Sequence, residues 1–445
     1  MESSRVNERP TDMVSAIFTI LMLGYYCFLL RRRRAQTYAF AFVLWAIYFA
    51  MGLIGIVGEV TNSISLVFPI NIEAPLALFV VLAAFISAFL RFDERQLPSL
   101  KFAWQSQIEN GLVAIQVYSI LFFIPFALDS LVGDPNLNRL LLSEKSNVLS
   151  GYGLLNTFAT AGAQLFVPSM VLAFLRLSPT KVQGRNLPRA VILLLCSLSF
   201  VIYVLAYVGR DGVVYWIMMA GLFTTLFWKN LVKPVNLLFV RLIIVLGIII
   251  ILPLIYITIS RFKEFEDGRS YGLLHYFGVQ IVNFSDYCSM DRPVTLGALC
   301  FPFIFDNVHP LIYDNYKFWD ESRQILVWDS LSKGKEPWMF GTFLSDFALD
   351  FTLGGALAIS ILLSALCTIT CSQLFVKGPS TISRFLLIVL LFQIPYWGGF
   401  YFRFALTNSY FLYNSALIFV IYFLQCFSGT KRSLKLVPPY DPPCQ

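Results

Sequence analysis

Charged residues are scarce in this chain. Only 13% of its 445 residues are Asp, Glu, Lys or Arg, whereas about a quarter of the residues of an ordinary soluble domain are charged. Hydrophobic residues make up 58% of the chain, and aromatic residues make up 16%. This balance argues against a soluble domain, because no soluble core needs so large an apolar fraction.

Histidine and closely paired cysteine are also scarce, which argues against a metal centre. The chain has two histidines, His275 and His309, and its eight cysteines form no Cys-x-x-Cys pair and no Cys/His cluster at zinc spacing. We therefore expect no metal and no cofactor. The sequence also has no internal repeat and no cytoplasmic globular domain that would bind a nucleotide. Cys288 and Cys300 lie in one long polar segment, and a single pair leaves open whether they are bridged.

Long apolar stretches fill most of the sequence. A helix needs about 20 mostly apolar residues to cross a bilayer with its backbone hydrogen bonds satisfied. Such stretches, free of charge apart from Asp129, lie at 13–30, 38–57, 74–90, 111–131, 154–174, 190–208, 213–228, 242–259, 351–376, 385–402 and 410–427. The sequence therefore predicts an all-α, polytopic membrane bundle of about eleven transmembrane helices, with residues 1–445 as one domain. The first stretch follows a polar segment that carries charges of both signs, and four arginines, residues 31–34, come directly after it. A cleavable signal peptide would have its positive charge before the apolar run, so we interpret this stretch as a retained helix.

Basic residues are shared unevenly between alternate connections. One set of connections, together with the C-terminal tail, holds 19 of the 33 Lys and Arg residues but only three of the 26 acidic residues. Because Lys and Arg are retained on the cytoplasmic side, this set is predicted to be cytoplasmic, with the N-terminus outside and the C-terminus inside. The net charge of +7 is then a topology signal, and we expect no nucleic-acid partner.

One external connection is much longer than the others. It covers residues 260–350, between the eighth and ninth predicted helices, and a connection of that length is usually functional or a small subdomain. Tyr and Trp residues alternate in it with Arg, Asp and Glu. Tyr271 and the other aromatic residues either stack on sugar rings or form the core of the loop itself.

Arg210 and Asp211 lie in the tight external turn between the sixth and seventh helices. Glycines flank them in the sequence Gly-Arg-Asp-Gly. A charge at that depth is costly unless it is paired or faces water. The two residues either form a local ion pair, or Arg210 is an arginine that binds a lipid pyrophosphate through its bidentate guanidinium.

Arg261 and Arg269 follow the eighth helix, and an external basic cluster departs from the general charge rule. Nearby acidic residues either neutralise this cluster on a solvated face, or the arginines bind the phosphates of a polyprenyl carrier. His275 is either a surface residue or the general base that deprotonates an acceptor hydroxyl. The residues leave both interpretations open.

Arg403 and Asp346 complete the candidate residues. Arg403 follows an aromatic stretch, so it either reaches the membrane interface from an aromatic belt or joins Arg210 and Arg261 at one anionic group. Asp346 lies at the start of the ninth helix, where it either favours the helix N-terminus electrostatically or binds a sugar hydroxyl.

Four features follow one another along the chain: many apolar helices, a Gly-Arg turn that opens a helix, an arginine-rich entry to one large external loop, and a glycine-bearing helix after it. The residues concerned are Gly209 and Arg210, Arg261 and Arg269, and the stretches 341–346 and 353–355. This order resembles the oligosaccharide repeat-unit polymerases of bacterial surface polysaccharides, the O-antigen and capsule polymerase family.

The resemblance implies a glycosyltransferase of the bacterial inner membrane that works on its periplasmic face. Such an enzyme transfers a growing glycan from one undecaprenyl pyrophosphate carrier to a new lipid-linked repeat unit, without metal or nucleotide sugar. On this chain Arg210, Arg261, Arg269 and Arg403 would bind phosphate, and His275 would be the base. The sequence leaves open whether a chain-length regulator protein binds.

Two other functions remain open. An O-antigen ligase uses the same lipid donor with many helices and a large external loop, and differs in the acceptor. A flippase or other transporter usually places ionisable residues at the bilayer midplane and has two matching halves. The predicted helices here are nearly free of charge, and the large loop has no counterpart in the other half of the chain.

Overall fold

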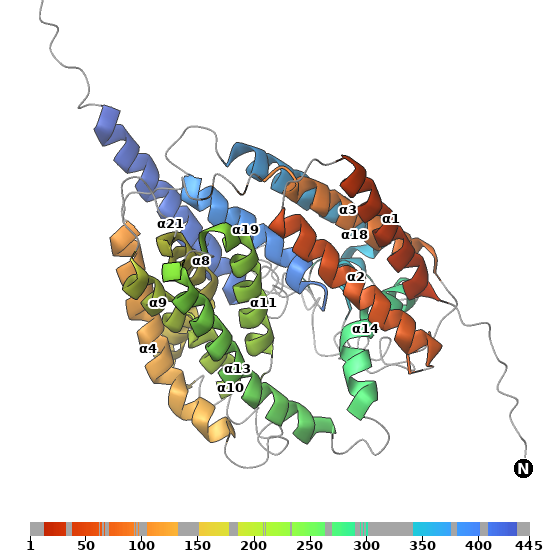
Figure 1. The fold of residues 1–445 in the computed structure, drawn as a ribbon, viewed down its shortest axis with the longest axis horizontal. Coiled ribbons are helices and arrows are strands. Elements are labelled where there is room, and N and C mark those ends of the chain that lie inside the picture. The colour runs from red at the N-terminus through yellow and green to blue at the C-terminus, as the bar shows by residue number, and fades with distance from the viewer. Residues whose placement is uncertain are drawn as a thin grey trace, which may run out of the picture.

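The computed structural model describes residues 13–32, 38–61, 63–64, 66, 71–92, 94, 97, 105–131, 151–177, 186–207, 209, 211–231, 234–262, 269–289, 294, 297, 300, 341–374, 381–400 and 408–433. Within these ranges all regular structure is helical (Figure 1). The helices are α1 (Val14–Arg32), α2 (Ala39–Val60), α3 (Glu73–Phe89), α4 (Gln105–Leu131), α7 (Leu154–Gln164), α8 (Phe166–Leu177), α9 (Leu187–Cys196), α10 (Ser199–Ala206), α11 (Asp211–Leu226), α12 (Trp228–Leu231), α13 (Pro234–Phe262), α14 (Arg269–Ser289), α18 (Phe343–Gln373), α19 (Thr381–Trp397) and α21 (Asn408–Ser433).

Each predicted apolar stretch coincides, over most of its described residues, with a helix or a pair of consecutive helices. In the described part, α1, α2, α4, the α9–α10 pair, α18 and α21 give six spans that are long and apolar enough to cross a membrane, and the bent pair α7–α8 makes a seventh. Shorter apolar helices lie in α3, α11, α13 and α19. The all-helical class is therefore confirmed, while the number of membrane crossings stays a prediction.

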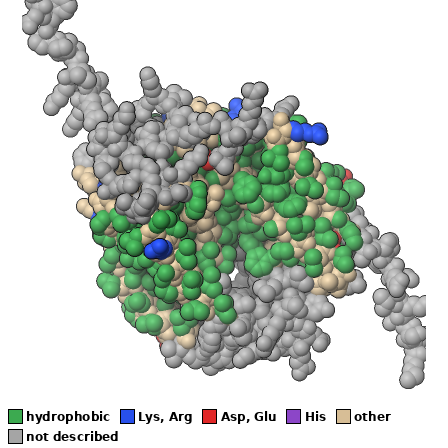
Figure 2. Space-filling view, in the orientation of Figure 1, with side chains coloured by type: hydrophobic (Ala, Val, Ile, Leu, Met, Phe, Trp, Pro, Cys, Tyr) green, Lys and Arg blue, Asp and Glu red, His purple; other side chains and the backbone are tan. Residues whose placement is uncertain are grey.

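The described surface is apolar over a wide area. Figure 2 shows hydrophobic side chains over most of the described part of one face, with few charged side chains among them. On α13, Leu238, Ile248 and Leu252 expose 61%, 58% and 62% of their surface. Soluble monomers rarely expose apolar patches larger than a few hundred Å². Together with the long apolar helices, this surface indicates a multi-pass membrane protein.

The fifth predicted helix is broken into α7 and α8, which are bent by 41° relative to each other. α7 ends at Gln164, and Pro168 lies four positions later. Proline has no N–H to donate to the Gln164 carbonyl, and its ring crowds that carbonyl. The break therefore has a local cause in the sequence.

The long segment 260–350 contains a helix that packs onto the bundle. α14 comprises 21 residues of this segment and packs against α2, α18, α3 and α1. Residues 278–287 of α14 are all buried. The described part of this segment is thus mostly helical, whereas its periplasmic location stays a prediction.

α14 crosses α2 at two glycines. A Cβ atom added at Gly278 would lie 2.9 Å from the Gly55 nitrogen and 3.0 Å from the Ile54 carbonyl carbon. These are backbone atoms, which cannot move aside as a flexible side chain can. Glycine therefore allows the two helix backbones to touch, as small residues do at helix crossings in membranes.

A buried carboxylate joins α1 to α2. Glu59, near the end of α2, accepts hydrogen bonds at Oε1 from the Ser15 backbone N–H at 3.1 Å and from the Ser15 hydroxyl at 3.0 Å. Ser15 is in the first turn of α1, where backbone N–H groups have no partner within the helix. The end of α2 and the beginning of α1 are thus held together on one side of the bundle.

Aromatic rings fill the contact between the two halves of the chain. Phe166 of α8 stacks on Phe200 of α10 with ring centroids 4.3 Å apart, and Trp397 of α19 lies parallel to Phe166 at 6.1 Å. Tyr410 of α21 contacts Trp397 at 5.3 Å. Because lipid is as apolar as these side chains, close packing rather than escape from water holds the helices together.

Candidate functional site

Five of the predicted site residues lie at the ends of three helices. Asp211 begins α11, Arg261 lies in the last turn of α13, and Arg269, Tyr271 and His275 fall in the first two turns of α14. α13 packs against α11 and contacts α14. Figure 1 shows the end of α13 and the beginning of α14 at the same lower edge of the molecule. The five side chains lie outside the described part of the structure, so the helices place only their backbones.

Arg210 and Arg403 lie outside the described residues. Directly before Arg210, the Gly209 N–H donates to the Val204 carbonyl at 2.9 Å, which closes the end of α10. Before Arg403, the described chain ends in the turn at 398–400, which follows α19. The proposed convergence of Arg403 with the other arginines therefore stays a prediction.

The start of α18, which carries Asp346, is fixed by its own capping groups. The Thr342 hydroxyl accepts from the Ser345 N–H at 3.3 Å, and the Ser345 hydroxyl accepts from the Thr342 N–H at 2.9 Å. This reciprocal arrangement satisfies two N–H groups at the helix N-terminus. The Phe343 N–H donates to the Gly398 carbonyl at 2.6 Å, so the beginning of α18 is held against the end of α19.

Asp346 and Asp350 differ in their environment, although both are in the first two turns of α18. Asp350 is fully buried, and its Oδ2 accepts a hydrogen bond from the Cys300 N–H at 2.7 Å. Asp346 is only partly buried. Since a carboxylate must be reachable to accept a hydrogen bond from a sugar, Asp346 is the better candidate for substrate, and Asp350 binds the backbone of Cys300.

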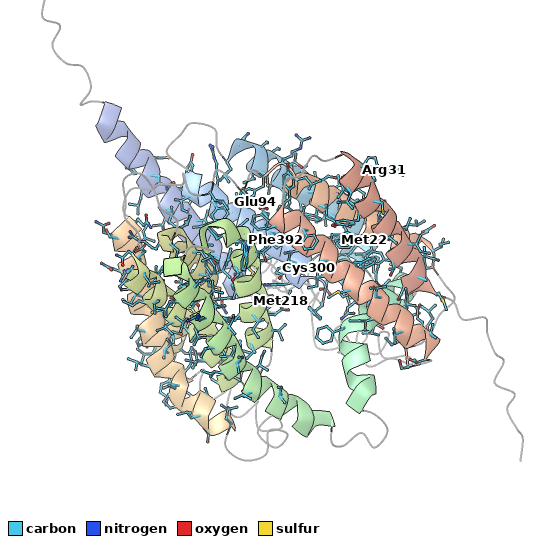
Figure 3. The ribbon with its side chains drawn as sticks, in the orientation of Figure 1. Met22, Arg31, Glu94, Met218, Cys300 and Phe392 are labelled. Carbon is cyan, nitrogen blue, oxygen red and sulfur yellow. The ribbon has the colours of Figure 1, made fainter. Side chains whose placement is uncertain are left out.

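Cys300 brings part of the long segment next to α18. Figure 3 places this residue near the middle of the view. Burial, together with the nearby carboxylates of Asp350 and Asp346, raises the pKa of the Cys300 thiol well above its ordinary value. The thiol is therefore protonated at neutral pH and is a poor nucleophile. The structure has no disulfide bond between Cys288 and Cys300, the pair for which the sequence left a bridge open.

The buried half of α14 carries polar side chains that sequence analysis did not single out. Gln280, Asn283, Ser285 and Asp286 are all buried, and the Ser285 hydroxyl accepts from the Asn71 N–H at 3.3 Å. The signal in the sequence was the three-residue spacing of Gln280, Asn283 and Asp286, which places them along one side of a helix. Polar groups at a helix contact inside a membrane bundle are typically functional or bind neighbouring helices.

The described residues contain no group of three or more His, Cys, Asp or Glu side chains that could hold a metal ion. The acidic residues Asp286, Asp346 and Asp350 come from α14 and α18, two helices that pack against each other. Carboxylates of this kind accept hydrogen bonds from hydroxyl groups. Asp286 and Asp350 are buried, so of these three carboxylates only the partly buried Asp346 can meet a ligand that carries hydroxyls.

No protein-family model matches this chain, and neither the curated proteins nor the solved structures include a significant match to it.

Proposed function

We propose that the chain is a multi-pass glycosyltransferase of the bacterial inner membrane that polymerises oligosaccharide repeat units carried on undecaprenyl pyrophosphate. Its active site would face the periplasm, with the N-terminus of the chain outside and the C-terminus in the cytoplasm. The distribution of basic residues supports this orientation, and the resemblance to O-antigen and capsule polymerases supports the reaction.

One structural observation supports the site more than any other. Arg261 and Arg269 lie at the end of α13 and the beginning of α14, two helices in contact whose ends are separated by only six residues. This connection keeps both backbones at the same edge of the bundle. Two guanidinium groups at one membrane surface suit a pyrophosphate, because each can form paired, charge-assisted hydrogen bonds with phosphate oxygens.

The proposed reaction is a glycosyl transfer between two lipid-linked sugars. The hydroxyl oxygen of the acceptor sugar attacks the anomeric carbon of the donor glycan, and the bond from this carbon to the pyrophosphate oxygen breaks. Undecaprenyl pyrophosphate leaves with the bonding electrons, and Arg210, Arg261, Arg269 and Arg403 stabilise its charge. His275 takes the proton of the attacking hydroxyl.

Two further residues would orient the sugars, and a third would position an arginine. Asp346 would accept a hydrogen bond from a sugar hydroxyl, Tyr271 would stack on a sugar ring, and Asp211 would hold the guanidinium of Arg210 in place. Asp346 differs from the other two in that its side chain is described, and its partial exposure supports this role.

A deletion strain tests the proposed function. We expect loss of long polysaccharide chains, with a single repeat unit still transferred to the lipid core, because ligation and export remain intact. The measurement is the length distribution of the surface glycan on a gel. Polymer that accumulates on its undecaprenyl carrier and never reaches the core would indicate a ligase, and precursor that accumulates in the cytoplasm would indicate a flippase; either result would reject the polymerase proposal.

A further inference from the structure

A buried carboxylate near the beginning of α4 accepts hydrogen bonds from two arginines. Glu109, in the second turn of α4, is fully buried. Its Oε1 accepts from Arg176 Nε at 2.8 Å, and its Oε2 accepts from Arg176 Nη2 at 2.9 Å. Arg189 Nε donates to the same Oε2 at 3.2 Å. These three side chains, from α4, the last turn of α8 and the first turn of α9, are called the arginine pair site below.

The two arginines of the arginine pair site carry one positive charge more than the single carboxylate of Glu109 neutralises. Glu109 Oε1 also accepts from the Gln105 side-chain amide at 2.9 Å, so both carboxylate oxygens are already engaged twice. Arg189 Nη2 donates to the Asn110 side chain, which is neutral. In the described part of the structure, the Nη1 groups of Arg176 and Arg189 have no hydrogen-bond partner. Among the described residues, one of the two guanidinium charges therefore has no counter-ion.

The two guanidinium groups are confined but reachable. The side chains of Arg176 and Arg189 expose 14% and 21% of their surface, and Glu109 exposes none. Removing a charge from water is costly unless an opposite charge compensates for it. A single arginine would suffice to neutralise Glu109, so a purely structural ion pair does not explain the second one.

The position of the site indicates which anion it would bind. It lies at the beginning of α4 and α9 and the end of α8, which belong to the helices long enough to cross the membrane. The uneven distribution of basic residues predicts that these helix ends are cytoplasmic. Phosphates of the inner leaflet lie at that level, and they attract basic residues next to the membrane.

We propose that Arg176 and Arg189 form a binding site for a phosphate group, supplied by an anionic phospholipid of the cytoplasmic leaflet. The free Nη1 groups of the two arginines would donate to its phosphate oxygens, while Glu109 holds both guanidinium groups in position. Inorganic phosphate has the same chemistry and is the alternative source. This inference does not depend on the proposed glycosyltransferase activity, because neither arginine nor Glu109 belongs to the proposed active site.

The experiment compares purified full-length protein with the Arg189→Gln variant. Native mass spectrometry measures how much phosphatidylglycerol, and separately phosphatidylcholine, each protein retains. Arg189→Gln keeps the bidentate pair between Arg176 and Glu109, so the fold is preserved. We expect the variant to retain phosphatidylglycerol about fivefold less strongly, the factor that corresponds to about 1 kcal/mol per basic residue near an anionic surface.

Arg241→Gln is the matched control, because Arg241 is an exposed arginine on α13 that is also predicted to be cytoplasmic but lies outside the arginine pair site. It should leave phosphatidylglycerol retention unchanged. If millimolar inorganic phosphate displaces the lipid from the wild type but not from the variant, the phosphate site is supported and free phosphate is identified as a second ligand. Equal phosphatidylglycerol retention by wild type and Arg189→Gln, at equal thermal stability, would overturn the proposal.

Discussion

Replacing Arg261 with alanine is expected to abolish long polysaccharide chains while the protein remains in the membrane at its normal level. Arg261 lies in the last turn of α13, next to the start of α14, where it is proposed to stabilise the pyrophosphate leaving group. Loss of one such electrostatic donor reduces the rate of a reaction about a hundredfold or more. Surface glycan from a strain that carries only the variant should therefore shift to single repeat units.

Arg241→Ala is the control for this experiment. Arg241 lies on the same helix, 20 residues before Arg261, and is predicted to be on the cytoplasmic side. Its loss should leave chain length normal. Arg261→Lys should restore part of the polymer, because lysine keeps the charge but not the bidentate geometry. Normal polymer from Arg261→Ala would remove Arg261 from the proposed phosphate site.

Replacing Gly278 with alanine is expected to destabilise the protein and to displace α14. The added Cβ would lie within 3.1 Å of three backbone atoms of α2, and neither helix can relieve this contact by rotating a side chain. Overpacking of this kind costs about 1–3 kcal/mol. Because α14 also carries Arg269, Tyr271 and His275, polymer length should fall together with stability. The measurement is the thermal unfolding midpoint of the purified variant, followed by its glycan profile.

Gly247→Ala provides the comparison for Gly278→Ala. Gly247 is within α13, and a Cβ added there meets nothing within 4 Å. Alanine favours helix over glycine by about 1 kcal/mol, so this variant should be as stable as the wild type or slightly more stable. If the two alanine variants unfold at the same temperature, α14 does not cross α2 in the close manner described above.

The helices of the apolar stretches could be predicted because the signal is local. A long run without charge can satisfy its backbone in lipid only as a helix, and this condition is read from neighbouring residues. α14 was not predicted as a helix because Gln280, Asn283 and Asp286 interrupt its apolar residues. Its burial comes from packing against α2 and α18, helices that are distant in the sequence.

The polar contacts of the fold could not be predicted, because they join distant parts of the chain. Glu109 and its partners Arg176 and Arg189 are 67 and 80 residues apart, and Cys300 and Asp350 are separated by 50 residues. No spacing rule connects such pairs. The candidate site was predicted from charge at helix ends, and the structure adds which helices carry those residues and that Asp346 is more accessible than Asp350.

The location of the segment 260–350 tests the central claim most directly. Alkaline phosphatase, which is active only outside the cytoplasm, can be fused after Asp320 and, in a second strain, after Gln445 at the C-terminus. We expect high activity from the first fusion and almost none from the second at equal expression. The reverse pattern would place Arg261, Arg269 and His275 in the cytoplasm, and the proposed reaction with periplasmic lipid-linked sugars would then be impossible.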